Sequence, residues 1–451
     1  MADQRQSAFA VFHRSSQEVY SAATLKVEDS TCCSYDIFFI KWDICVTVSL
    51  LALINLVIAT IFIYEYSARD CLKIVMEHVE RVLMTLKHKE PDRIPIDLGS
   101  VINGMHHVAL RKLLKFMGVG DVEILIIDRM QGLGKIPDFI LEHFDVDFRH
   151  VFVNPPKLNE IRYISEDKFI DEFGITYERH GYYFEIVEGL QPLYNARSPK
   201  DIENYSLPAI KDYRVRGMGK IAKMYNEAGY AVVINGATAG IWELAERLHG
   251  MSNCLKNLIL NPELMESLLD LTLEIHKRFW ELILNEAGDY GHIVLQGDDY
   301  GTQVGPQMPP KLWERFIFPR LKELISFIKK NAKVKVLLHC CGGIRPFIRK
   351  LIEAGVDILN PLQPRARGMN RKEIKREFSG KLIFHGGLDI QYVLPQGTAE
   401  EVENEVKDVI ETYAPGGEYI FSPAHNIQAD VPPENVLAAY RAALLYGRFH
   451  K

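Results

Sequence analysis

The carboxyl-terminal part of the chain repeats one pattern, in which a short apolar run is followed by a stretch with the spacing of an amphipathic helix. The apolar runs lie at residues 333–343, 356–363, 381–389 and 418–428, and the helical stretches at 344–354, 370–378, 399–413 and 432–447. Strands that alternate with helices across short links are typical of parallel sheets. The pattern therefore predicts a βα barrel or an open parallel sheet.

The same pattern extends toward the amino terminus. Further strand-like runs lie at 93–98, 148–153, 231–235 and 292–296, and long helical segments lie at 254–288 and 310–331. About eight strands over roughly 380 residues favour one α/β fold, a (β/α)8 TIM barrel, over two smaller domains. Two-residue alternation around 169–194 interrupts the pattern and predicts a β-hairpin inserted between barrel units.

Two of the strand-like runs end in side chains that bind metals. The first ends in His339, Cys340 and Cys341, and the run at 418–428 contains His425. The strand period of two places His339 and Cys341 on one face and Cys340 on the other. Imidazole and thiolate together suit zinc, and three protein ligands with one open position are typical of a catalytic site. The alternative is a metal-free pocket with a buried thiol beside a hydrogen-bonded histidine.

Other polar residues also follow the predicted strands, at the end where barrel active sites form. Asp298 and Asp299 are candidates for a catalytic acid, a metal ligand or a carboxylate that orients a ligand histidine, and the alternative is helix capping. The remaining candidates are predicted to bind substrate: Asp97, Asn360, Gln363, His385, Asp389, Asn426 and Gln428.

Several motifs, taken in order, resemble the uroporphyrinogen decarboxylase superfamily from about residue 75 to the end. They lie at residues 88–97, 171–175, 297–303, 338–343, 355–361, 385–389, 422–428 and 431–435. The resemblance implies a TIM barrel, which we expect to occupy residues 93–451.

One branch of this superfamily decarboxylates uroporphyrinogen without a metal or an organic cofactor. Members of this branch share an arginine-rich segment just after the first strand. This segment binds the carboxylates of the substrate. The corresponding residues here, 98–107, contain no arginine. A substrate with many carboxylates needs several charge-assisted partners, so this chain fits that branch poorly.

The chain is more similar to the zinc-dependent methyltransferases that work with corrinoid proteins, such as coenzyme M methyltransferases and O-demethylases. The resemblance implies that His339, Cys341 and His425 bind zinc, although the third ligand is commonly cysteine. It also implies a partner protein that carries cobalamin or a related corrinoid. We therefore expect methyl transfer between that corrinoid and a small methylated substrate or thiol. The alternatives are a uroporphyrinogen decarboxylase and a non-catalytic, membrane-anchored barrel.

A separate feature precedes the barrel. Residues 44–64 carry no charge and are long enough for an α-helix that crosses a bilayer, with Trp42 and Tyr64 at the two ends. More basic residues follow this run than precede it, which predicts a single-pass membrane protein with its barrel in the cytoplasm. Residues 1–43 would then be extracytoplasmic or disordered, and 65–92 a linker and entry helix. With a translation start downstream of this run, the protein would instead be cytoplasmic and soluble.

Charge and motif content narrow the function further. A net charge of −6 gives no reason to expect a nucleic-acid partner. The seven cysteines are odd in number and scattered, which suits a reducing compartment better than a disulfide framework. The chain has neither a Walker loop nor a Gly-x-Gly-x-x-Gly motif, so the sequence predicts no nucleotide cofactor.

Overall fold

The computed structural model describes residues 76–236 and 239–449. The predicted membrane helix at 44–64 and the segment 1–43 lie outside these residues. Within the described part of the chain, no helix is both long and apolar enough to cross a membrane.

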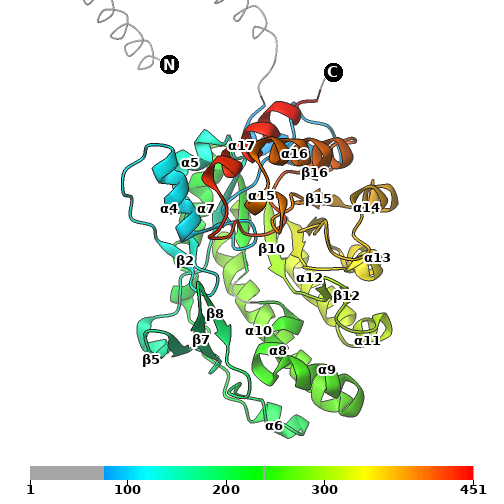
Figure 1. Ribbon diagram of the computed structural model, residues 1–451. Coiled ribbons are helices and arrows are strands. Elements are labelled where there is room, and N and C mark those ends of the chain that lie inside the picture. The colour runs from blue at the N-terminus through cyan, green and yellow to red at the C-terminus, as the bar shows by residue number, and fades with distance from the viewer. Residues whose placement is uncertain (1–75, 237–238, 450–451) are drawn as a thin grey trace, which may run out of the picture. The chain divides into compact units, whose positions relative to one another are not determined.

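Seven parallel strands form the central sheet, and their order follows the sequence (Figure 1). The strands are β4 (Phe148–Val151), β9 (Ala231–Asn235), β10 (Ile293–Gly297), β13 (Lys335–His339), β14 (Ile358–Asn360), β15 (Ile383–His385) and β16 (Tyr419–Ile420). Their side chains are largely buried, as expected for parallel strands that helices cover. Each strand falls within, or within one residue of, a run that the sequence predicts to be a strand.

The segment around Ile96 closes the sheet into a ring. The Phe421 N–H, just after β16, donates to the Pro95 carbonyl at 2.8 Å, and the Asp97 N–H donates to the Phe421 carbonyl at 2.9 Å. On the other side, the Asp147 N–H, just before β4, donates to the Ile96 carbonyl at 2.9 Å. The predicted first strand therefore lies between the two edge strands, and the α/β fold matches the predicted TIM barrel.

Helices connect and surround the strands (Figure 1). The helices of eight or more residues that follow β4 are α7 (Met218–Glu227), α8 (Ile241–His249), α9 (Met251–Leu260), α10 (Pro262–Ala287), α12 (Phe318–Asn331), α13 (Arg345–Ala354), α14 (Arg371–Phe378), α16 (Ala399–Tyr413) and α17 (Pro433–Tyr446). The shorter α11 (Pro310–Phe316) directly precedes α12, and α4 (His107–Phe116) precedes β4. Side chains that cap the first turn mark where two of the longest helices begin. Asn261 accepts from the Leu264 N–H at the start of α10, and Thr398 forms a capping box with Glu401 at the start of α16.

The predicted insertion is larger than a hairpin. It is a four-stranded antiparallel sheet of β5 (Arg162–Ser165), β6 (Lys168–Ile170), β7 (Thr176–His180) and β8 (Tyr183–Ile186), at the lower left of Figure 1. All four residues of β5 are exposed, so this strand lacks the apolar alternation that would have predicted it. The sheet buries a small aromatic cluster of Phe169, Tyr177 and Phe184.

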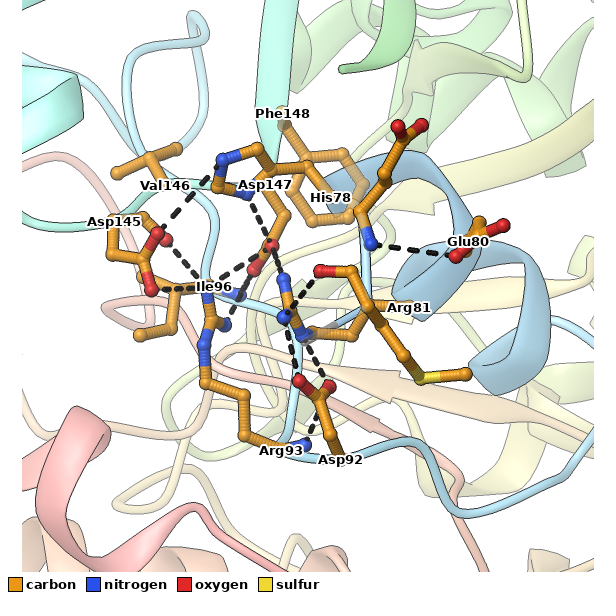
Figure 2. A network of polar contacts seen from close by, with 12 residues as sticks. His78, Glu80, Arg81, Asp92, Arg93, Ile96, Asp145, Val146, Asp147 and Phe148 are labelled. Carbon is orange, nitrogen blue, oxygen red and sulfur yellow. Dashed lines mark hydrogen bonds and ion pairs between the residues drawn. The ribbon is translucent and has the colours of Figure 1, made fainter. Parts of the chain in front are cut away.

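A buried ionic network fastens the entry helix α3 (His78–Thr85) to the amino-terminal end of the barrel (Figure 2). Its centre is Asp147, which is fully buried. The Asp147 carboxylate accepts hydrogen bonds from His78 Nδ1, Arg81 Nη1 and Arg93 Nη1, at 2.8, 2.5 and 2.6 Å. Burial alone would raise the pKa of Asp147, but the His78 hydrogen bond and the two guanidinium charges lower it. This end of a barrel contributes stability rather than catalysis.

Candidate metal centre

His339, Cys341 and His425 come together at the carboxyl-terminal ends of the strands. His339 ends β13, Cys341 follows two residues later, and His425 lies in the segment after β16. One ligand atom from each lies within 4.8 Å of the other two. The His339 Nε2 and Cys341 Sγ atoms are 3.3 Å apart, and the two histidine rings are 5.1 Å apart between centroids. Two strands separate β13 from β16 in the sheet, so the curl of the barrel brings His425 to the other two residues.

These three residues fit a zinc ion. Zinc lies about 2.0–2.3 Å from nitrogen and sulfur ligands, which places tetrahedral ligand atoms roughly 3.5 Å apart. Burial, together with the nearby His339, lowers the pKa of His425 to about 3, so its imidazole is neutral and has a free lone pair at neutral pH. Burial also raises the pKa of the Cys341 thiol. A bound cation would lower this pKa again, because its positive charge favours the thiolate. Three protein ligands leave the open position of a catalytic site.

The loop after β13 is held by hydrogen bonds on both sides. The Cys341 N–H donates to Asp299 Oδ1 at 2.6 Å, and the Gly342 N–H donates to Gln363 Oε1 at 2.9 Å. Gly342 has φ +86°, and a Cβ atom there would lie 2.5 Å from the Gly301 backbone, so only glycine suits this turn. Cys340 lies in the core, where its Sγ accepts from the Tyr300 N–H at 3.3 Å. The strand therefore presents Cys341 to the site and Cys340 to the interior.

The two aspartates after β10 have different surroundings. Asp298 is buried, and its carboxylate accepts from the Trp242 and Glu243 N–H groups at the start of α8, at 3.1 and 3.0 Å. Burial and the charge of Glu243 raise the pKa of Asp298 to about 8. Asp299 is 29% exposed, and its Oδ1 lies 4.0 Å from His339 Nε2. Asp298 thus caps a helix, whereas Asp299 lies beside the proposed ligands.

Glu243 and Arg247, which are not among the residues predicted from the sequence, lie one turn apart on α8. Their side chains are 3.7 Å apart, and burial and the charge of Asp299 raise the pKa of Glu243. Glu and Arg four residues apart occur on many solvated helix faces, so their spacing alone indicates no site. The place of α8 in the chain could have indicated these two residues, because α8 begins within a few residues of the carboxyl end of β9, where barrel active sites form.

The predicted substrate-binding residues divide into two groups. Asp97, Asn360 and His385 are buried and bonded to one another inside the barrel. The other four are bonded to neighbouring segments. Gln363 accepts from Gly342, Asp389 accepts from Arg365 and Gln391, Asn426 bonds to residues 101, 104 and 131, and Gln428 contacts the Tyr183 hydroxyl. These hydrogen bonds do not test substrate contact, so the substrate-binding role of the seven residues stays a prediction.

The profile of the uroporphyrinogen decarboxylase (URO-D) family matches residues 159–444, which is more than half of the chain. The chain belongs to the uroporphyrinogen decarboxylase family. The predicted superfamily is thereby confirmed. Uroporphyrinogen decarboxylase from Idiomarina loihiensis is 22% identical over 282 residues, which cover 60% of this chain and 74% of that protein. The enzyme of the same name from Psychromonas ingrahamii is 19% identical over 268 residues, covering 56% and 71% of the two chains.

Among solved structures, a methyltransferase from Methanosarcina mazei has a similar fold. It superposes with a TM-score of 0.58 and 18% sequence identity, and the match covers 82% of this chain and 99% of that one. At this identity the likeness establishes a shared fold. This URO-D family member therefore has relatives named for decarboxylation and a structural neighbour named for methyl transfer.

Proposed function

We propose that this URO-D family member is a zinc-dependent methyltransferase that moves a methyl group between a small methylated substrate or thiol and a corrinoid carried by a partner protein. The observation that carries the proposal is the convergence of His339, Cys341 and His425 at the catalytic end of the barrel. A decarboxylase that uses no metal has no need for two histidines and a thiol within 4.8 Å of one another.

The roles of the residues follow from their positions. His339, Cys341 and His425 would hold the zinc, which supplies a Lewis acid able to activate a thiol or polarise an ether oxygen. Asp299 is the candidate for moving a proton, because its carboxylate is partly exposed and 4.0 Å from His339 Nε2. Asp298 would act through α8, whose first turn it caps and which carries Glu243.

Uroporphyrinogen decarboxylation is the second candidate, and the names of the two bacterial relatives favour it. The absence of arginine at 98–107 remains the argument against it. Porphyrinogen turnover by the purified protein would identify this activity directly. A protein with neither zinc nor turnover would fit the third possibility, a non-catalytic barrel.

We expect the purified full-length protein to contain about one zinc per chain, in keeping with one three-ligand site. Elemental analysis after gel filtration measures this ratio. Incubation with a strong chelator should remove the zinc and stop methyl transfer to or from free cobalamin, and added zinc should restore both. Porphyrinogen turnover that persists after metal removal would contradict the proposal.

The proposed localisation rests on residues 44–64. We expect the full-length protein to sediment with membranes, to stay there in high salt, and to be released by detergent, because a bilayer-spanning helix is held by apolar burial rather than by charge. A protein that lacks residues 1–70 is the matched control, and it should remain in the supernatant. Full-length protein found wholly in the soluble fraction would overturn the anchor.

A further inference from the structure

We propose that Asp97, His385 and Asn360 form a hydrogen-bonded relay that fixes the tautomer of His339 and so keeps its Nε2 lone pair free for a metal. The inference rests on the proposed zinc site, and it gives these three buried residues a positioning role in place of substrate contact. It concerns which nitrogen of His339 carries the hydrogen, a property that decides whether this imidazole can be a ligand at all.

The relay runs without a break through the barrel interior. Asp97 Oδ2 lies 2.9 Å from His385 Nε2, and His385 Nδ1 lies 2.7 Å from Asn360 Nδ2. Asn360 Oδ1 lies 2.5 Å from His339 Nδ1, and His339 Nε2 faces Cys341 Sγ at 3.3 Å. The three relay residues and His339 are 0–5% exposed. They lie at the ends of three adjacent strands and on the segment that closes the barrel.

The direction of each hydrogen bond in the relay follows from the bond between His385 and Asp97. A carboxylate only accepts, so a His385 ring with a single hydrogen must carry it on Nε2, and its Nδ1 is then an acceptor. The Asn360 amide therefore turns its NH2 group toward His385 and its oxygen toward His339. That oxygen accepts from Nδ1–H of His339. The hydrogen of the neutral His339 ring is thus on Nδ1, and its Nε2 lone pair points toward Cys341.

Reversing the relay shows what it prevents. Without Asp97, the hydrogen of His385 is free to move to Nδ1, where it would face the Asn360 NH2 group. The amide would then flip and present its NH2 group to His339. The hydrogen of His339 would move to Nε2, which is the atom that faces Cys341, and this would block metal binding at that nitrogen.

A second histidine holds the first residue of the relay in its charged state. His150 Nε2 lies 2.8 Å from Asp97 Oδ1, so each carboxylate oxygen has its own imidazole partner. Burial alone would raise the pKa of Asp97, but His150 and His385 together lower it. Both imidazole partners thus favour the carboxylate form of Asp97, which accepts hydrogen bonds from both rings.

The most direct test reads the tautomer itself in metal-free, full-length protein labelled with nitrogen-15 histidine. Two-bond proton–nitrogen correlation spectra distinguish the two neutral forms, and loss of the signal in His339→Gln identifies the ring. We expect His339 to carry hydrogen on Nδ1 in the wild type and to lose this preference in His385→Leu. A wild-type His339 protonated on Nε2 would overturn the relay. This result does not depend on the identity of the reaction, so it separates the relay from the proposed function.

Metal affinity gives a second readout, measured as Co²⁺ absorbance titrations of the chelator-treated protein. We expect Asn360→Leu to weaken Co²⁺ binding by about 10- to 100-fold, the usual effect of removing the partner of a ligand histidine. Asn360→Asp should bind as tightly as wild type, because its carboxylate still accepts from His339 Nδ1. Asn435 is the matched control, since it is as buried as Asn360 and its side-chain NH2 group donates to the Leu394 and Gly397 carbonyls, with no bond to the relay among the described residues. Equal losses of affinity in Asn360→Leu, Asn360→Asp and Asn435→Leu would mean a general structural effect and would refute the relay.

Discussion

Replacing Cys341 with serine, or His425 with alanine, should remove both the zinc and the methyl-transfer activity. Serine is a poor replacement because its alkoxide is inaccessible at neutral pH, whereas cysteine binds as a thiolate. Either change leaves two protein ligands where the structure brings three within 4.8 Å. A Lewis acid supplies several kcal/mol of transition-state stabilisation, so we expect activity to fall by at least about a hundredfold.

Cys340→Ala is the matched control for this experiment. Cys340 is the neighbouring thiol and lies in the core against the Tyr300 N–H, so its loss should leave zinc content and turnover close to wild type. Elemental analysis and an assay with methylcobalamin measure the two properties on the same preparations. Normal zinc and normal turnover in Cys341→Ser would contradict the proposed site. A metal-free Cys340→Ala protein would show that the other cysteine is the ligand.

The barrel and the convergence of the three ligands could be predicted because both depend on short-range patterns. Apolar runs with helical stretches between them predict parallel strands, and the period of two along residues 339–341 predicts which cysteine shares a face with His339. His425 could be placed with them because carboxyl-terminal strand ends meet at one end of a barrel. The structure places strands in all four of the carboxyl-terminal runs.

The partners of individual polar side chains could not be predicted in this way. Asp97, Asn360 and His385 follow strands, as pocket residues do, and only the packing shows that they bond to one another. Strand β5 escaped detection because its residues are exposed and lack alternation. Glu243 comes from a helix whose position over the site is a tertiary property. For the buried polar residues and for Glu243, the deciding contacts join residues far apart in the sequence.

Asp147→Ala should be among the most destabilising single changes in the barrel. It would leave the Arg81 guanidinium, which is 3% exposed, and the 7% exposed Arg93 side chain without the carboxylate between them. Removing one partner of a buried ion pair costs about 3–5 kcal/mol. The lower end of this range applies here, because Arg81 keeps its pair with Asp92 and Arg93 keeps its pair with Asp145. We expect the free energy of unfolding to fall by about that amount in urea titrations followed by circular dichroism. Glu353→Ala removes an exposed carboxylate that pairs with Lys350, and as the control it should cause no measurable change.

The difference in free energy of unfolding between wild type and Asp147→Ala should depend on pH, and this dependence is a second check on the role of Asp147. Because the folded pKa of Asp147 is lowered, its contribution to stability is fully present above its unfolded pKa of about 3.9 and is lost as the pH falls toward the folded value. The gap between wild type and Asp147→Ala should therefore be constant from pH 8 to about pH 5 and should shrink in more acidic solution. A gap that widens with acid would mean that Asp147 is protonated more readily in the folded protein. The two arginines and His78 would then not stabilise its charge.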